Sequence, residues 1–124
     1  MDAQLGNIVE AIRQLREQVR WKPEKAVQHL AKRVDLGHLP PGTTVTAYDE
    51  IIRRIVQTPA AEVWVYRWGE TLYPTVVTHV EEVQWLVILG LDGTMETAFP
   101  PEDAETYLVN PRFSRLGTLE ELGV

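Results

Sequence analysis

Apolar residues in the first half of the chain follow the period of helices. Those between Leu5 and Val19 recur at spacings of three and four, which places them on one stripe of a helix of about four turns. The pattern predicts an amphipathic helix within residues 1–20. Its apolar stripe is suited to packing on the rest of the domain or on a second copy of the chain, as a homodimer.

Two further helices are expected before the middle of the chain. Pro23 suits the first turn of one, because its missing N–H has no partner there, and this helix should run to about Val34. The segment Asp35–Thr44 contains two glycines and a Pro–Pro pair, so it is predicted to be a loop. Thr46 then fits the N-cap of a third helix that ends before Pro59.

From Glu62 onward the hydrophobic period changes to the alternation of strands. Val63 and Val65 face one way and the aromatic residues between and after them face the other. Four antiparallel strands are predicted, over residues 62–68, 72–80, 83–91 and 95–99, with Gly69–Glu70 and Asp92–Gly93 as turns. Pro74 lacks a ladder donor, which favours an edge strand or a bulge.

The fold class predicted from these elements is α+β, with N-terminal helices packed on a four-stranded antiparallel β-sheet. The N-terminal amphipathic helix occupies residues 1–20, and the main α+β domain residues 21–108. That domain closes with a short helix through Ala104–Leu108. Residues 109–124 are expected to form a C-terminal tail along the surface.

Composition agrees with one folded domain. The chain has 124 residues, of which 44% are hydrophobic and 24% charged, as in globular proteins. It has no cysteine, which excludes disulfides and thiolate metal sites and makes a reducing cytoplasm the expected compartment. No apolar run approaches the roughly 20 residues that cross a bilayer, so no membrane partner is expected.

The net charge of −6 is unevenly distributed. Residues 1–60 hold 9 basic and 7 acidic side chains, whereas residues 61–124 hold 3 and 11. An acidic protein has no general attraction for polyanions, so a contact with nucleic acid would have to be local. The basic stretch with Lys22, Lys25 and Lys32 is the place for it. The alternative is a solvated helix face that balances an acidic sheet.

Chemistry is concentrated on the second predicted helix. A basic stripe within an arc of about 100° holds Lys22, Lys25, His29, Lys32 and Arg33, and the helix's small and apolar residues are expected to form the buried face opposite. Imidazole exchanges protons near neutral pH, and flanking cations stabilise a developing dianion. RNA supplies its own nucleophile, the 2′-OH, so cleavage without a metal needs little more. The alternative for His29 is a surface histidine.

The order of motifs resembles a known family. The run His29-Leu-Ala-Lys32-Arg33, a turn, a helix ending near a proline, and strands closing on Gly93-Thr-Met-Glu-Thr97-Ala-Phe-Pro100 are similar to the barnase–EndoU–colicin–RelE type of toxin nuclease domain, in its phage- and polymorphic-toxin branch. The resemblance implies a metal-independent ribonuclease without a cofactor. It also implies RNA, often tRNA, as substrate and a cognate inhibitor protein as partner.

The resemblance also implies roles for individual residues. His29 would be the general acid or base, Lys32 and Arg33 a phosphate clamp, and Thr97 a hydroxyl donor to the scissile phosphate; Lys22, Lys25 and Arg67 would bind substrate. Arg33 stands where the family pattern often has a second histidine, and arginine cannot exchange protons near neutral pH. Glu96 beside Thr97 is a second departure, because it repels RNA.

Other functions are weighed against this one. A non-catalytic protein-interaction domain, either an immunity or accessory protein or a degenerate nuclease fold, would use the acidic sheet to engage a basic partner. Aromatic residues of the strands could stack on bases, but cross-strand packing is the favoured interpretation. His38 and His79 have no second ligand at metal spacing, so no metal site is expected.

Overall fold

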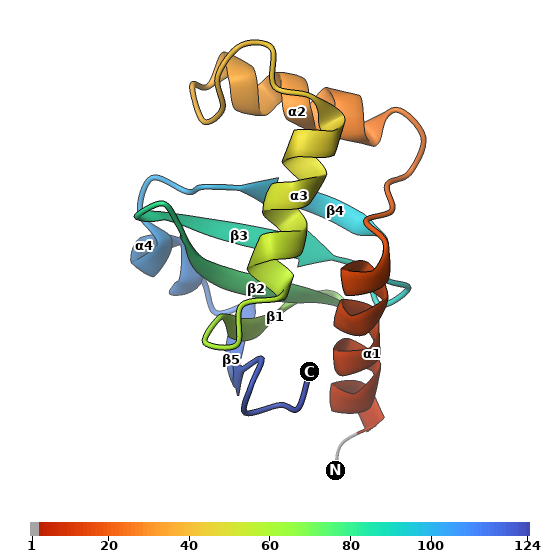
Figure 1. Ribbon diagram of the computed structural model, residues 1–124. Coiled ribbons are helices and arrows are strands. Elements are labelled where there is room, and N and C mark those ends of the chain that lie inside the picture. Colours follow the sequence, from red (N-terminus) through yellow and green to blue (C-terminus); the bar gives the residue numbers. More distant parts are fainter. Residues whose placement is uncertain (1–2) are drawn as a thin grey trace.

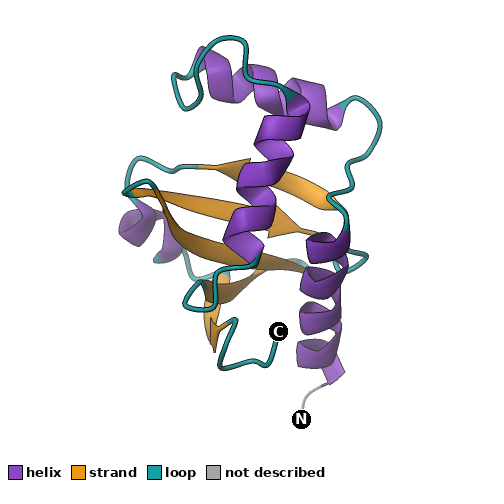
Figure 2. Ribbon diagram, in the orientation of Figure 1, coloured by secondary structure: helices purple, strands orange, loops and turns teal. Residues whose placement is uncertain are grey.

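A five-stranded antiparallel sheet forms the centre of the computed structural model, which describes residues 3–124; the first two residues of the predicted N-terminal helix lie outside it (Figures 1 and 2). The helices are α1 (Ala3–Glu17), α2 (Lys25–Asp35), α3 (Val45–Val56) and α4 (Ala104–Leu108). The strands are β1 (Glu62–Trp68), β2 (Thr71–Val80), β3 (Val83–Leu89), β4 (Met95–Phe99) and β5 (Phe113–Thr118). The predicted α+β class, with helices on an antiparallel sheet, is therefore confirmed.

The strand order is β4-β3-β2-β1-β5. The first four strands follow one another as hairpins, and β5 returns to pair with β1 at the opposite edge from β4. The sheet thus has one strand more than expected, because residues 113–118 pair with β1 and do not form a surface tail. Phe113 is buried on this strand, whereas Ser114 and Arg115 are exposed, so its hydrophobic pattern is short.

β2 lies inside the sheet, which makes the predicted edge position of Pro74 wrong. Pro74 pairs with Val65 of β1. The ladder with β3 begins only at Thr75, which pairs with Ile88. Pro74 lies beyond the end of that ladder, so its missing N–H removes no bond to β3.

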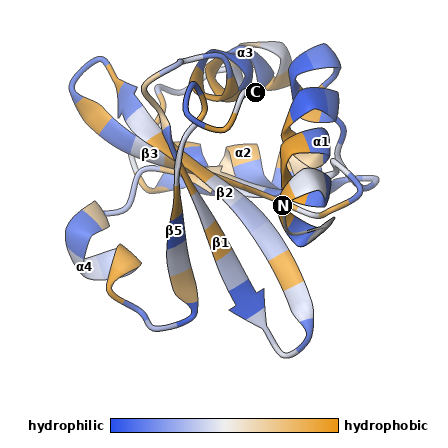
Figure 3. Ribbon diagram, turned by 90° about the horizontal axis from the view of Figure 1, so that it is seen from below, coloured by the Kyte–Doolittle hydropathy of each residue, from blue (hydrophilic) through white to orange (hydrophobic). Residues whose placement is uncertain are grey.

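Hydrophobic side chains cover both faces of the sheet, unequally. The main core lies between the sheet and helices α1 and α3, while a smaller cluster on the other face packs under α4 (Figures 1 and 3). Ile12 of α1 and Leu119 beyond β5 are both fully buried in the main core. The predicted N-terminal and C-terminal segments therefore share one core with residues 21–108.

The helix starts differ from the expected ones by one or two residues. α3 begins after Thr44, whose hydroxyl accepts a 3.0 Å hydrogen bond from the Ala47 N–H, so the predicted cap at Thr46 is wrong. α2 begins at Lys25, after Glu24 in a left-handed conformation with φ 69°, and Pro23 precedes the helix. The left-handed residue turns the chain before α2 can start.

Candidate functional site

The chain leaving α1 is tied to β4 before α2 begins. The Met95 N–H donates to the Arg20 carbonyl at 2.8 Å, and Arg20 Nη2 donates to the Asp92 carbonyl at 2.7 Å. These bonds hold the connection against the start of the edge strand. Consequently α2 lies along the β4 edge of the sheet, where it contacts β4 and α3 (Figure 1).

His29 and Thr97, two of the predicted site residues, are in contact at this edge. Thr97 Oγ1 lies 3.1 Å from His29 Nδ1, a hydrogen bond that joins α2 to β4. The Trp21 ring packs on His29 as well, with its centroid 5.4 Å from that of the imidazole. Burial lowers the pKa of His29, and the positive charges of Arg33, Lys25 and Lys32 lower it further, so the imidazole is neutral at pH 7.

Arg33 lies one helical turn beyond His29 and is buried. Its side chain is only 4% exposed, and its guanidinium lies over the Phe99 ring at 5.5 Å. Two residues along β4 and four along α2 advance by similar distances, about 7 Å and 6 Å. The pairs His29–Thr97 and Arg33–Phe99 therefore form successive steps along one seam.

This burial corrects the predicted orientation of α2. Arg33 was expected on the open basic stripe and Val27 on the buried face, but Val27 is 63% exposed. His29, expected on the open stripe, is half-buried, and so are Leu30 and Val34 of the expected buried face. α2 packs on the edge strand β4 and on aromatic side chains, and both can contact polar residues of the helix. The covered face of α2 is therefore centred closer to Arg33 than the apolar stripe alone would place it.

The three lysines of the predicted site are exposed. Lys22 Nζ lies 3.9 Å from a Glu96 carboxylate oxygen, a surface pair of little energetic weight. Lys25 Nζ donates to the Gln28 side chain at 3.4 Å. Lys32 lines a surface hollow beside Arg33, so its ammonium group lies near the α2–β4 seam.

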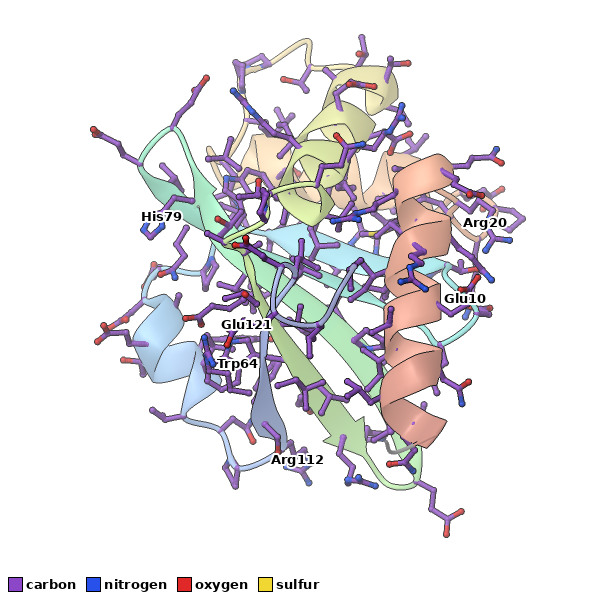
Figure 4. The ribbon with its side chains drawn as sticks, turned by 60° about the horizontal axis from the view of Figure 1, so that its bottom comes forward. Glu10, Arg20, Trp64, His79, Arg112 and Glu121 are labelled. Atoms are coloured by element: carbon purple, nitrogen blue, oxygen red, sulfur yellow. The ribbon has the colours of Figure 1, made fainter. Side chains whose placement is uncertain are left out.

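Arg67 is not brought to this group. It lies on β1, which β2 and β3 separate from β4, so the sheet alone places it about 14 Å away. Arg67 lines a different hollow with Arg112, and Figure 4 shows Arg112 at the end of the molecule far from α2. The structure gives no geometric support for the predicted role of Arg67 in this site.

Three aromatic or titratable side chains at the seam were absent from the predicted site. The Trp21 indole N–H donates to Asp49 at 2.9 Å, and the buried Tyr48 hydroxyl donates to the Ala98 carbonyl of β4. His38, in the loop after α2, lines the same hollow as Arg33. Tyr48 could have been recognised from the sequence, because its hydroxyl is the polar group at the end of the apolar stripe of α3. No local sequence pattern points to Trp21 or His38.

The hollow beside Arg33 has a volume of about 330 Å³. Lys32, Arg33 and His38 line it from the α2 side, and Phe99 and Glu102 line it from the end of β4. Three cationic or titratable groups against one carboxylate make it suited to an anion.

The described residues offer neither a metal-binding cluster nor a membrane-spanning helix. Residues 3–124 hold no cluster of three or more histidine, cysteine, aspartate or glutamate side chains that could hold a metal ion. Within the same residues, no helix is long and apolar enough to cross a membrane.

Comparison with known proteins gives this chain no relative. No protein-family model, no curated protein and no solved structure matches it. The resemblance to toxin nuclease domains therefore rests on the residues quoted above, and the candidate site on its geometry.

Proposed function

We propose that this protein is a metal-independent endoribonuclease-like domain, acting on RNA such as tRNA, with its reaction centre at the α2–β4 seam. The observation that carries the proposal is the 3.1 Å contact between His29 Nδ1 and Thr97 Oγ1. It joins a proton-exchanging group to a hydroxyl, and the cations of α2 lie within a turn of them. These are the parts that RNA cleavage without a metal requires.

The hydrogen bond suggests which nitrogen of His29 takes the proton. If Nδ1 carries hydrogen, it donates to Thr97 Oγ1, which leaves the Nε2 lone pair free to act as base. The Thr97 hydroxyl hydrogen is then free to donate to a phosphate oxygen. One contact thus orients both groups, as second-partner hydrogen bonds commonly orient catalytic histidines.

The proposed reaction balances without a metal or cofactor. His29 Nε2 takes the proton of the ribose 2′-OH, and the 2′ oxygen attacks the adjacent phosphorus. The bond from phosphorus to the 5′ oxygen breaks, and that oxygen receives a proton from solvent. The products are a 2′,3′-cyclic phosphate and a 5′-hydroxyl, and the positive charges of α2 offset the extra negative charge in between.

The experiment is incubation of the purified protein with total tRNA in EDTA. Wild type is expected to cleave, and His29→Ala is expected to lose activity by about a hundredfold or more, the range for removal of a general acid or base. Thr97→Val, which keeps the shape and removes the hydroxyl, should also be slower. Because burial and nearby cations lower the pKa of His29, the rate should fall on acidification at a lower pH than for an ordinary histidine.

His79→Ala is the matched control. His79 is an exposed histidine of β2 that points away from α2, so its removal should leave cleavage unchanged (Figure 4). Intact tRNA with folded wild-type protein would refute the proposal, and so would equal cleavage by wild type and His29→Ala.

A second candidate, a non-catalytic protein-interaction domain, is favoured by a different observation. Five large apolar side chains in the acidic half of the chain are exposed: Trp68 at 59%, Val83 at 49%, Leu91 at 39%, Tyr107 at 39% and Val109 at 75%. Exposed apolar groups among acidic ones are typical of a surface for a basic protein partner. The same tRNA assay separates the two candidates, because this one predicts no cleavage by wild type.

A further inference from the structure

The guanidinium of Arg33 is buried without an ionic partner. Its Nε and Nη1 atoms are out of contact with solvent and have no hydrogen-bond acceptor among the described residues. No salt bridge to Arg33 is found within the same part of the chain, and burial lowers its pKa. Unpaired buried charge is costly, so its retention calls for an explanation.

Capping of α2 does not explain the position of Arg33. Cations in a last helical turn often bind the free carbonyl groups there. Here the backbone already satisfies them: the N–H groups of Leu36, Gly37 and His38 donate to the carbonyls of Lys32, Val34 and Arg33, at 2.8–3.0 Å. The Arg33 guanidinium is therefore not needed to bind these carbonyl groups.

Packing on Phe99 explains it only in part. A cation over an aromatic ring is modestly stabilised, and the Arg33 guanidinium lies 5.5 Å from the Phe99 centroid. An aromatic ring is at most a weak acceptor for N–H groups. Those donors remain available to an acceptor that the chain does not supply.

His38 also has a buried nitrogen atom without a hydrogen-bond partner, and it lines the same hollow as Arg33. Its backbone N–H is fixed to the Arg33 carbonyl at 2.8 Å, and its ring Nδ1 is buried with no partner among residues 3–124. Burial and the nearby Arg33 charge lower the pKa of His38. Lys32 and the exposed Glu102 line the same hollow, so the groups that face His38 there are two cations and one carboxylate.

We propose that the hollow beside Arg33 is a phosphate-binding subsite, in which Arg33 Nε and Nη1 donate to one phosphate group and His38 and Lys32 complete its coordination. A fork of guanidinium donors matches phosphate oxygens better than a point charge does. Arg33 lines the hollow while these two nitrogen atoms are out of contact with solvent, so binding requires a rotation of the side chain that turns them toward the phosphate.

The phosphate is assigned to an RNA strand, an assignment that rests on the proposed function. Arg33–Phe99 is the next step after His29–Thr97 along the α2–β4 seam, about 6–7 Å further on. Neighbouring phosphates of an extended single strand are separated by a distance of the same order. A strand with its scissile phosphate at Thr97 would therefore place the next one in the hollow.

Binding is measured without cleavage, by NMR of the ¹⁵N-labelled protein. One arm adds inorganic phosphate against chloride at equal ionic strength, and the other adds a single-stranded oligodeoxynucleotide, which lacks the 2′-OH and cannot react. Both ligands are expected to shift the Arg33 Nε–H and His38 imidazole signals. Bound phosphate should also raise the pKa of His38, because a nearby anion favours the imidazolium.

Variants test the named groups. Arg33→Met, of similar length and uncharged, should weaken binding of the oligodeoxynucleotide about tenfold or more. Glu102→Gln should strengthen it. Arg54→Met is the matched control, because Arg54 is an exposed arginine of α3 that lines a different hollow. If Arg33→Met does not fold, Arg33→Lys retains the charge and loses the fork, and the wild-type shifts remain a test by themselves.

The outcomes separate the subsite from the proposed function. Absence of shifts with both ligands, or equal binding by wild type and Arg33→Met, overturns the subsite even if His29→Ala abolishes cleavage. Shifts with inorganic phosphate alone overturn the assignment to a strand. Shifts with both ligands, lost in Arg33→Met, support the subsite even if wild-type protein leaves tRNA intact.

Discussion

Tyr48 is the side chain that joins α3 to the edge strand of the sheet. It is fully buried, and its hydroxyl donates to the Ala98 carbonyl of β4. The Trp21 ring packs on it at 5.6 Å, and Trp21 in turn contacts His29. Burial raises the pKa of Tyr48 to about 12, so the hydroxyl stays protonated and keeps donating far above neutral pH. Tyr48 therefore supports the seam on which the candidate site is built.

Tyr48→Phe is expected to destabilise the protein by about 1–3 kcal/mol, because it leaves the buried Ala98 carbonyl without its donor. Tyr73→Phe is the matched control: the Tyr73 ring packs on Tyr66, and among the described residues no hydrogen bond to its hydroxyl is found. Urea unfolding measures both. Equal midpoints for the two variants would contradict a structural role for the Tyr48 hydroxyl.

The sequence indicated part of the candidate site and misplaced another part. His29 and Thr97 were paired by a resemblance in motif order, and the structure has them in contact. The burial of Arg33 was not predictable, because a helical wheel assigns the apolar side to the core. α2 packs instead on Phe99, which lies far from it in sequence, and on Trp21, which lies just before it. His38 was considered only as a metal ligand, because it is the fold of its loop that brings it to the hollow beside Arg33.

At the scale of elements, α3 has two threonines, two residues apart, that could each serve as its N-cap. Thr44 and Thr46 both precede the apolar stripe, and both are exposed. Thr44 has the extended backbone of a cap, with φ −91° and ψ 162°, and its hydroxyl accepts the Ala47 N–H. Thr46 lies inside the first turn. Residue preferences alone cannot rank them, because either threonine can accept from an N–H three residues on.

Thr44→Ala should lower the free energy of unfolding by about 1 kcal/mol, because the Ala47 N–H loses its acceptor. Thr46→Ala removes the same atoms at a helical position, where alanine is the better helix former. It should leave stability unchanged or raise it by a few tenths of a kcal/mol. Chemical denaturation of the two variants decides between the caps, and the reverse order of stabilities would show that Thr46 caps α3.

The sequence predicted the positions of the strands better than it predicted which face of α2 is buried. Alternation and turn residues located four of the five strands to within about two residues. Such signals are local, and each hairpin carries its own. Whether a strand lies inside the sheet or at its edge is a property of the whole molecule, so Pro74 could be recognised as a missing donor while its internal position could not.

At the scale of the whole molecule, the C-terminal segment closes the fold. β5 pairs with β1, and the chain then turns over the main core, where the Leu119 N–H donates to the Ala61 carbonyl at 2.9 Å. Gly123 accepts a 2.9 Å hydrogen bond from Arg13, so the C-terminal segment is tied to α1 (Figure 1). The apolar residues of this segment recur at every third position from Phe113 to Leu122 and do not alternate as in a strand. Its pairing partner lies about 50 residues earlier, beyond the reach of a local pattern.

Leu119→Ala tests whether this closure is part of the core. Leu119 is fully buried, so its truncation should cost about 2–5 kcal/mol through lost burial and the cavity left behind. Val109→Ala, at a residue that is 75% exposed, lies in the same predicted tail and should change stability by less than about 0.5 kcal/mol. Urea midpoints measure the difference. A surface tail would give two equal midpoints, whereas a C-terminal segment that completes the core makes Leu119→Ala the far less stable variant.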